Sequence, residues 1–414
     1  MQQKGEISML RRLSVTMTAT ATFCLLCSSL TIAASKKPQP PDKFPPNPLE
    51  ITTPDPLLPR SPKDKQPLTP QERQKLEAAL DDLNQQAAAK LQAGDKITAF
   101  DIWNRELRLR RFLGSLAEVQ ALSRVGTVAW NQNESQQVQY ITQRLQAIQK
   151  EAQSQKTTDL QLLQALGLAY LEVRSPKEAV EVYTQVLAAV RQRKDSAAEV
   201  DTLKTIGELH LGWFDYASAA STYEQLRAFA SSRGERLNEI AYLQQLAYIY
   251  EQTKQPEQSL KIRNQLAEVY QQENNLIQLS TLKQAIGSDY ESLARKNPSL
   301  LQEAFKNYQE AYTTAWQLEQ YVRAGEALQK LIALYRSQGQ VEEALQASQI
   351  LLQAQERAAN LYGLMNAYDQ IGQIHLERKD YPQARVAFQK GLEIAQQLNY
   401  DELYFNEQIQ KLSK

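Results

Sequence analysis

LKTIGELHLGWFDYASAASTY, residues Leu203–Tyr223, contains two apolar stripes separated by a polar turn at Asp215. Within each stripe the apolar residues recur at intervals of three and four, the spacing that places side chains on one face of a helix. The segment therefore predicts two helices joined by a short turn, which is a helical hairpin.

The same pattern recurs along the chain at intervals of about forty residues. The earlier copy has Leu163, Leu166, Gly167, Tyr170, Ala179 and Tyr183, and the later copy has Leu243, Leu246, Ala247 and Tyr250. Weaker copies extend the pattern in both directions. One hairpin has been repeated along the chain, and the periodicity predicts about eight of them.

A small residue stands in the middle of the first helix of several copies, as at Gly207 and Gly167. Glycine in a helix interior costs about 1 kcal/mol relative to alanine. A cost repeated at a fixed interval implies a repeated gain. We expect that gain to be close approach of the second helix, whose own small residue, Ala219 or Ala179, faces the glycine.

This pattern resembles the tetratricopeptide repeat (TPR), a helix pair with a large apolar, small and aromatic series followed by Ala and then Tyr or Phe. The usual period is about 34 residues, and the period here resembles that of the subclass with longer helices. The resemblance implies an all-α fold, a right-handed superhelical solenoid of about eight TPR-like hairpins with a C-terminal capping helix at residues 401–413.

The chain divides into three predicted parts: residues 1–34, 35–70 and 71–414. The last is the TPR solenoid. The second holds 12 of the 16 prolines and is predicted to be a flexible, extended linker. The remaining four prolines all fall in predicted turns between a first and a second helix, namely Pro176, Pro256, Pro298 and Pro382.

Residues 13–34 are uncharged, follow Arg11 and Arg12, and end in small residues. This pattern is typical of a secretory signal cleaved after Ala33. The alternative is an uncleaved membrane anchor, because 22 uncharged residues are long enough to span a bilayer. We expect an exported protein of the periplasm or thylakoid lumen, or one anchored to the membrane by residues 13–34. The only cysteines, Cys24 and Cys27, lie in this segment.

Several function classes are disfavoured by composition. The chain has 47 basic and 47 acidic residues, so its net charge does not indicate a nucleic-acid partner. The only histidines, His210 and His375, occupy the position of Tyr170 in other copies and are interpreted as packing residues. The sequence predicts no catalytic residues, no metal site and no cofactor. The repeats leave no room for a catalytic domain, so we expect a protein that is not an enzyme.

The densest charge cluster is the run Arg105, Arg108, Arg110 and Arg111. We interpret it as a solvated helix face, with an acidic partner or lipid headgroups as the alternative.

In TPR proteins the first helices line a concave groove that binds extended protein segments. Carried over residue by residue, the resemblance implies a partner-binding groove at Arg124, Gln164, Lys204, Glu208, Gln244, Tyr248, Glu251, Gln284, Ser288, Glu291, Gln329, Lys330, Arg336, Asp369 and Gln373. The Lys and Asn residues that hold a terminal carboxylate in chaperone-binding TPRs are missing. The middle of the groove is acidic, at Asp201, Glu208, Glu251 and Glu291, which fits a basic segment or weakly bound divalent ions.

The predicted function is a non-enzymatic scaffold or assembly factor outside the cytoplasm that binds protein segments in its concave groove. In outline the chain is similar to exported cyanobacterial TPR proteins that assist photosystem II assembly. The alternative is a membrane-tethered structural component of an envelope or secretion apparatus.

Overall fold

The computed structural model of the protein describes residues 47–50, 54–58, 67–154 and 159–412. Within these ranges the only regular elements are seventeen α-helices and three short 3-10 helices. The chain divides into two compact units, one ending at Gly114 and the other beginning at Ser115. The predictions for residues 1–34, including Cys24 and Cys27, lie outside the described residues.

The first unit is one hairpin with a segment packed on it. Helix α2 (Pro70–Gln92) packs against α3 (Lys96–Arg110), and the 3-10 helices η1 (Pro48–Glu50) and η2 (Arg111–Leu113) both contact α3. Helix α2 begins with a capping box, in which Thr69 accepts from the Glu72 amide and the Glu72 carboxylate accepts from the Thr69 amide at 2.8 Å.

The described part of the proline-rich segment is docked on this hairpin. Leu49 is only 1% exposed, and the arginines of α3 bind the segment's carbonyl oxygens and the carboxylate of Asp55. The interpretation of the arginine run as a solvated face is therefore wrong, because Arg105, Arg108, Arg110 and Arg111 are all half-buried and bound within the first unit. The predicted flexible linker, residues 35–70, stays untested at 35–46, 51–53 and 59–66, which lie outside the described residues.

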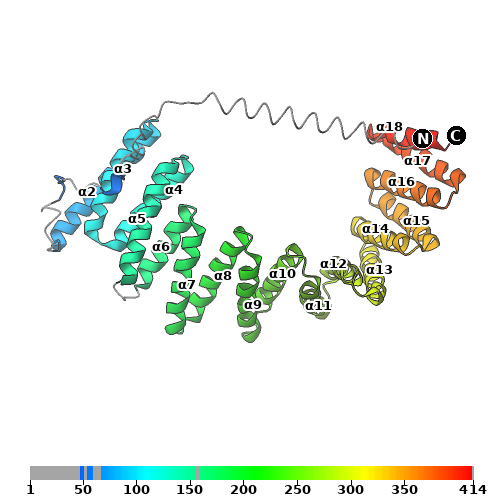
Figure 1. Cartoon of the computed structure of the whole chain (residues 1–414), viewed down its shortest axis with the longest axis horizontal. Coiled ribbons are helices and arrows are strands. Elements are labelled where there is room, and N and C mark those ends of the chain that lie inside the picture. Colours follow the sequence, from blue (N-terminus) through cyan, green and yellow to red (C-terminus); the bar gives the residue numbers. More distant parts are fainter. Residues whose placement is uncertain (1–46, 51–53, 59–66, 155–158, 413–414) are drawn as a thin grey trace, which may run out of the picture. The chain divides into compact units, whose positions relative to one another are not determined.

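The second unit contains seven further hairpins in chain order, followed in Figure 1 by colour from cyan to red. The pairs are α4 (Ser115–Asn131) with α5 (Ser135–Ser154), α6 (Leu160–Glu172) with α7 (Pro176–Gln192), α8 (Ser196–Gly212) with α9 (Tyr216–Ser232), α10 (Arg236–Gln252) with α11 (Pro256–Gln272), α12 (Leu276–Ala294) with α13 (Leu301–Gln317), α14 (Tyr321–Ser337) with α15 (Val341–Arg357), and α16 (Leu361–Glu377) with α17 (Tyr381–Leu398).

A third 3-10 helix, η3 (Pro298–Leu300), lies between α12 and α13, and α18 (Glu402–Lys411) packs on α17. Within the second unit, each hairpin packs against its neighbours in sequence. The predicted all-α solenoid of eight hairpins with a capping helix is confirmed.

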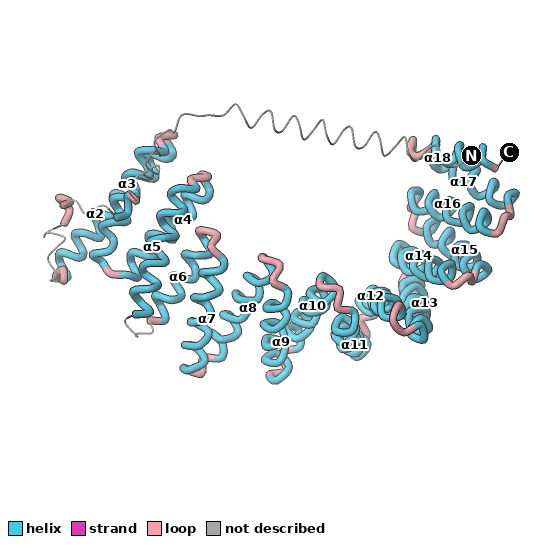
Figure 2. The backbone as a smooth tube through the Cα atoms, viewed as in Figure 1, coloured by secondary structure: helices cyan, strands magenta, loops and turns pink. Residues whose placement is uncertain are grey.

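The described turns within the hairpins are short, and all but the one between α12 and α13 follow one plan (Figure 2). A residue in the left-handed conformation ends many helices, such as Phe214 with φ of 59°, and the next amide bonds back to the helix. After α8, for example, the Asp215 amide donates to the His210 carbonyl at 2.9 Å. All four prolines outside the linker lie in such turns or in the first turn of a second helix, as predicted.

The mid-helix glycines allow close approach, but the expected partner is wrong. A Cβ built at Gly207 would lie 3.1 Å from Tyr223 Cε2, and one at Gly372 would lie 2.5 Å from Phe388 Cε1. The nearest atoms belong to an aromatic ring of the second helix, and not to Ala219. Gly167 and Gly287 face Tyr183 and Tyr308 in the same way, at 2.9 and 2.7 Å. The ring lies where a larger residue would place its side chain.

Not every hairpin pairs a glycine with a ring. In α4–α5, a Cβ at Gly126 would lie 2.6 Å from Val173 Cγ1 and 3.6 Å from Ile141 Cγ2. Two further hairpins replace the glycine itself. In the α10–α11 hairpin Ala247 replaces the glycine, and the residue sixteen positions later is Arg263 instead of an aromatic. In the α14–α15 hairpin the small and large members are exchanged, because Ile332 stands at the glycine position and the buried Ser348 at the aromatic one. The exchange preserves the combined volume that close packing requires.

Replacing Gly372 with alanine is expected to destabilise the protein by about 1–2 kcal/mol, because overpacking typically costs about 1–3 kcal/mol and the helix-propensity gain of about 1 kcal/mol offsets part of it. The Phe388 ring is buried and cannot move aside cheaply. Thermal unfolding followed by circular dichroism measures the effect.

Gly207→Ala is the matched control, since its Cβ would meet Tyr223 at 3.1 Å, where a small shift suffices. We expect it to be nearly neutral. Equal effects of the two substitutions, or stabilisation by Gly372→Ala, would show that the ring contact does not set the packing.

Candidate functional site

All fifteen predicted groove residues lie on the first helices of their hairpins, from α4 to α16, and none is buried. The exposed members are Gln164, Glu208, Gln244, Tyr248, Glu251, Gln329 and Lys330. The half-buried members are Arg124, Lys204, Gln284, Ser288, Glu291, Arg336, Asp369 and Gln373. The spacing therefore identified solvent-accessible positions of the first helices correctly.

Several members of the set bind neighbouring helices of the same stack. Gln244 donates to the hydroxyl of Tyr270 at 2.7 Å, and Glu291 accepts from the hydroxyl of Tyr308 at 2.8 Å. Arg336 forms an ion pair with Glu377 on the next first helix. These side chains help to hold adjacent helices together.

The last hairpin uses two members in the same way. The hydroxyl of Tyr404 on α18 donates to Asp369 at 2.7 Å and accepts from Gln373 at 3.0 Å. Burial, with a further contribution from the Asp369 carboxylate, raises the pKa of Tyr404 to about 12. Asp369 and Gln373 thus attach the capping helix.

Glu251 reaches a buried charge cluster. Arg263, nearly buried, donates to Glu251 and also to Asp289 at 2.8 Å, and the hydroxyl of Ser259 donates to Asp289 at 3.0 Å. Burial raises the pKa of Asp289, although the Arg263 guanidinium acts in the opposite direction. This cluster joins α10, α11 and α12 where other hairpins have a glycine and an aromatic ring.

A pocket of about 350 Å³ opens between the first helices α6 and α8. Its lining combines apolar surface with one carboxylate and one guanidinium, and Glu208 is the only predicted groove residue in it. The lining residues are Tyr170, Leu171, Arg174, Pro176, Thr205, Glu208, Leu209, Gly212 and Trp213. Tyr170 is buried and donates its hydroxyl to Gln149 at 2.7 Å, which fixes that wall.

Exposed aromatic residues continue from this pocket in both directions. Trp213 is 64% exposed and Phe214 is 74% exposed. Phe214 meets Tyr216 edge to face with 6.2 Å between ring centroids, and Tyr216 meets Tyr248 at 6.5 Å. On the other side, the Arg174 guanidinium lies 6.0 Å from the ring of Trp130.

The sequence analysis missed this surface. The signal was present, because Trp213 and Phe214 are two adjacent large aromatics directly before the polar turn at Asp215. Contiguous exposed apolar groups rimmed by polar ones are typical of interaction sites.

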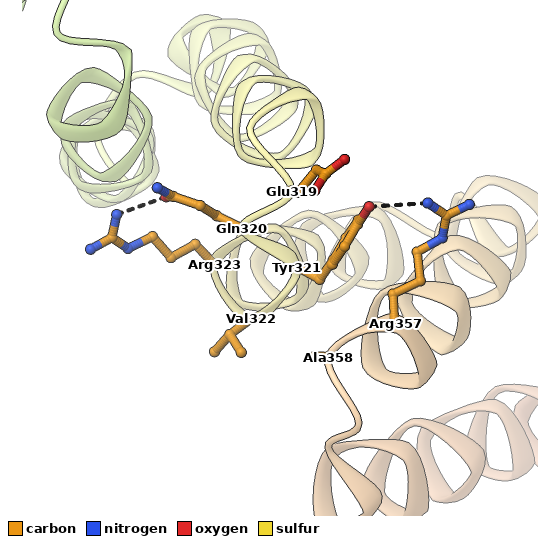
Figure 3. Close-up of a pocket in the computed structure, with 7 residues that line it drawn as sticks. All are labelled: Glu319, Gln320, Tyr321, Val322, Arg323, Arg357 and Ala358. Atoms are coloured by element: carbon orange, nitrogen blue, oxygen red, sulfur yellow. Dashed lines mark hydrogen bonds between the residues drawn. The ribbon is translucent and has the colours of Figure 1, made fainter.

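A second pocket, of about 390 Å³, lies at the start of α14 (Figure 3). Both of its arginines are bound to neighbouring side chains. Arg357 donates to the Tyr321 hydroxyl at 3.0 Å and stacks 5.3 Å from the Trp316 ring centroid, and Arg323 donates to Gln320 at 2.7 Å. Figure 3 shows Arg323 and Arg357 pointing away from each other, so their charges do not converge on one ligand.

The comparison with protein families agrees with the repeated hairpin. Residues 323–397, which span α14 to α17, match a tetratricopeptide repeat family model. Residues 323–397 are thus recognised as tetratricopeptide repeats, and the rest of the helical stack is TPR-like in fold. No curated protein matches the sequence.

Solved structures similar to this chain share little sequence with it. Aspartyl phosphate phosphatase F from Bacillus subtilis is 17% identical, with 71% of this chain and 78% of that chain covered and a TM-score of 0.42. BtubC from P. vanneervenii is 16% identical, with 54% and 92% covered and a TM-score of 0.39. The quorum sensor NprR from B. thuringiensis is 15% identical, with 71% and 80% covered and a TM-score of 0.36.

The two histidines of the TPR array lie in equivalent turns. His210 Nδ1 lies 3.2 Å from Asp215 Oδ2, and His375 Nδ1 lies 3.3 Å from Asp380 Oδ2. Each aspartate also caps the following helix, and hydrogen bonds from Ser218 lower the pKa of Asp215. Both histidines thus contact the turn that links first and second helix.

The acidic residues of the predicted groove do not gather. Asp201 and Glu208 lie on α8, Glu251 on α10 and Glu291 on α12, and two of them already bind Arg263 and Tyr308. Among the described residues no three Asp, Glu, His or Cys side chains come together as a metal site. The suggestion of weak divalent-ion binding therefore has no geometric support.

No helix among the described residues is both long enough and apolar enough to cross a membrane.

Replacing Arg263 with alanine should lower the free energy of unfolding by about 3–5 kcal/mol, because it leaves the buried Asp289 carboxylate without its cationic partner. Chemical denaturation followed by circular dichroism reports the change.

Glu251→Gln removes the other partner of Arg263, whose side chain is largely exposed. We expect this control to change stability by less than about 1 kcal/mol, as is usual for exposed ion pairs. If Glu251→Gln lowers the free energy of unfolding as much as Arg263→Ala does, the ion pair with Glu251, and not the one with Asp289, would be the stabilising interaction.

Proposed function

We propose that this TPR protein is a scaffold that binds an extended protein segment on the exposed side of its first helices, with the pocket between α6 and α8 as the anchor. The observation that carries the proposal is the combination of that apolar pocket with exposed Trp213 and Phe214. Burying a large apolar side chain contributes about 1.5–3 kcal/mol, so covering these two rings provides a driving force for association.

The charges at the pocket indicate the chemistry of the bound segment. Within the described part of the chain, Glu208 forms no ion pair, and the Arg174 guanidinium lies 6.0 Å from the Trp130 ring without a carboxylate partner. A bound segment with a basic residue beside Glu208 and an acidic residue beside Arg174 would form an ion pair with each of these two charges. Between them, an aromatic or branched aliphatic side chain fits the apolar pocket.

The remaining parts of the predicted groove contribute less to recognition in this proposal. Gln244, Glu291, Asp369 and Gln373 already bind neighbouring helices. Engaging them would require breaking those hydrogen bonds. Recognition is therefore concentrated at the C-terminal ends of α6, α8 and α10 and in the turns that follow.

We further propose that the protein acts outside the cytoplasm as an assembly factor and has no catalytic activity. The support for export is the sequence pattern of residues 13–34, a basic start followed by an uncharged stretch that ends in small residues. The support for a binding role is that the repeats fill the chain from about Pro70 onward. A membrane-tethered structural role remains the alternative, because the same pattern is long enough to form an anchor.

Selection from a peptide library displayed on phage tests the binding proposal. The immobilised protein is expected to enrich peptides with one aromatic or aliphatic anchor flanked by a basic and an acidic residue. Trp213→Ala is expected to weaken binding of an enriched peptide at least tenfold, and Glu208→Gln severalfold, as measured by fluorescence anisotropy.

Leu237→Ser is the matched control for these variants, because Leu237 is also highly exposed but lies at the N-terminal end of α10. Its binding should equal that of the unmodified protein. Enrichment of no peptide, or equal losses in all three variants, contradicts a specific anchor at this pocket.

Cell fractionation with N-terminal sequencing separates the two proposed locations. We expect a soluble exported species that begins near Ala34. A full-length species confined to membranes would support the tethered alternative, and a full-length species in the cytoplasm would contradict both.

A further inference from the structure

The short helix η1 brings a leucine from the proline-rich segment onto the first hairpin. The Asn47 side chain accepts from the Leu49 amide at 2.9 Å, and the Asn47 carbonyl accepts from the Glu50 amide at 2.9 Å, which closes the turn. Leu49 is buried, and η1 packs on α3. The segment is thus held by one apolar side chain in a folded turn.

Two arginines of α3 and η2 bind the backbone of this turn. Arg108 donates to the Pro48 carbonyl at 2.8 Å, and Arg111 donates to the Leu49 carbonyl and lies 3.5 Å from the Glu50 carboxylate. Proline lacks an amide, but its carbonyl remains an acceptor. The guanidinium groups therefore satisfy backbone acceptors of a segment that forms neither a long helix nor a strand.

A third arginine binds the segment's carboxylate. Arg105 donates through two nitrogens to the two oxygens of Asp55, both at 2.8 Å, which is the bidentate geometry of strong guanidinium–carboxylate pairs. The Asp55 carboxylate also accepts from the Leu57 amide at 3.0 Å. Hydrogen bonding by Arg105 holds the pKa of Asp55 below its usual value.

The fourth arginine of the run has a different role. Arg110 binds Glu106, which is buried on the same helix, and Asp81 on α2. It holds the hairpin together, whereas Arg105, Arg108 and Arg111 face partners fifty to sixty positions earlier in the chain. Arg110 therefore stabilises the hairpin, whereas the other three arginines form a binding surface on it.

We propose that the outer face of α3, with Arg105, Arg108 and Arg111, is a binding site for an extended segment containing a leucine and a downstream aspartate. The chain's own residues 47–50 and 54–58, here called the strap, occupy it. Because the strap is covalently attached, it binds at the high effective concentration of an intramolecular ligand.

The strap also limits how far the first hairpin can lie from residues 1–34. With the strap bound, only residues 35–46 separate Ala34 from the docked turn, at most about 43 Å of chain. Without it, residues 35–69 would allow up to about 125 Å. In the membrane-tethered alternative, the site would therefore determine how far the first hairpin can lie from the anchor.

Hydrogen exchange on the unmodified full-length chain tests strap docking directly. The amides of Leu49, Glu50, Leu57 and Leu58, each bonded within the strap, should exchange at least tenfold more slowly than in a synthetic peptide of residues 45–60. Exchange at the rate of the free peptide would overturn the proposal, and this measurement requires no variant to fold.

Binding in trans tests whether the face is a site. A fluorescent peptide of residues 45–60 should bind full-length protein carrying Leu49→Asp and Asp55→Arg at least tenfold more tightly than it binds the unmodified protein, whose strap competes. Adding Arg108→Ala to that variant should abolish binding. A peptide carrying the Leu49→Asp change serves as the control and should not bind.

Absence of peptide binding to a strap variant with an unchanged circular dichroism spectrum would overturn the proposal. So would equal binding to the unmodified and strap-variant proteins, because the peptide would then occupy a different surface.

Discussion

The contact between a glycine of the first helix and an aromatic ring of the second sets the geometry of four of the eight described hairpins. The ring occupies the space that a side chain at the glycine position would take, so the two helices approach more closely than two ordinary side chains allow. The helix cost of glycine, about 1 kcal/mol, is offset by this packing. Where the glycine is missing, Arg263 or the Ile332–Ser348 exchange fills the same volume.

This packing of a ring on a glycine acts within one hairpin, and it leaves part of the first helices free to bind a partner. Within the second unit, each hairpin completes its core with its own side chains and those of its neighbours in sequence, as expected for repeat proteins. The packing contacts leave the solvent side of the first helices uncommitted in part, and their C-terminal ends carry Trp213, Phe214 and the pocket beside Glu208. Elsewhere, the hydroxyl groups of Tyr270 and Tyr308 on second helices form hydrogen bonds with Gln244 and Glu291 on first helices. There the solvent side of the first helices helps to hold adjacent helices together.

The helices and turns could be predicted from the sequence because their signals are local. Spacing at three and four positions defined the helices, and Pro176, Pro256, Pro298 and Pro382 marked the turns. The ring above Gly207 could not be predicted as reliably, because the contact register of two helices depends on three-dimensional packing, and Ala219 was an equally reasonable partner. Docking of Leu49 and Asp55 on α3 had no local signal, since the arginines lie some fifty positions away. Trp213 and Phe214 were overlooked because turns were assumed to be polar.

In the proposed mode of binding, the C-terminal ends of the first helices bind the partner, and the second helices serve only to support them. Backbone hydrogen exchange across residues 115–412, compared with and without a saturating peptide ligand, tests this most directly. We expect added protection at the C-terminal turns of α6, α8 and α10, with little change in α7, α9 and α11. Added protection confined to those second helices would contradict it.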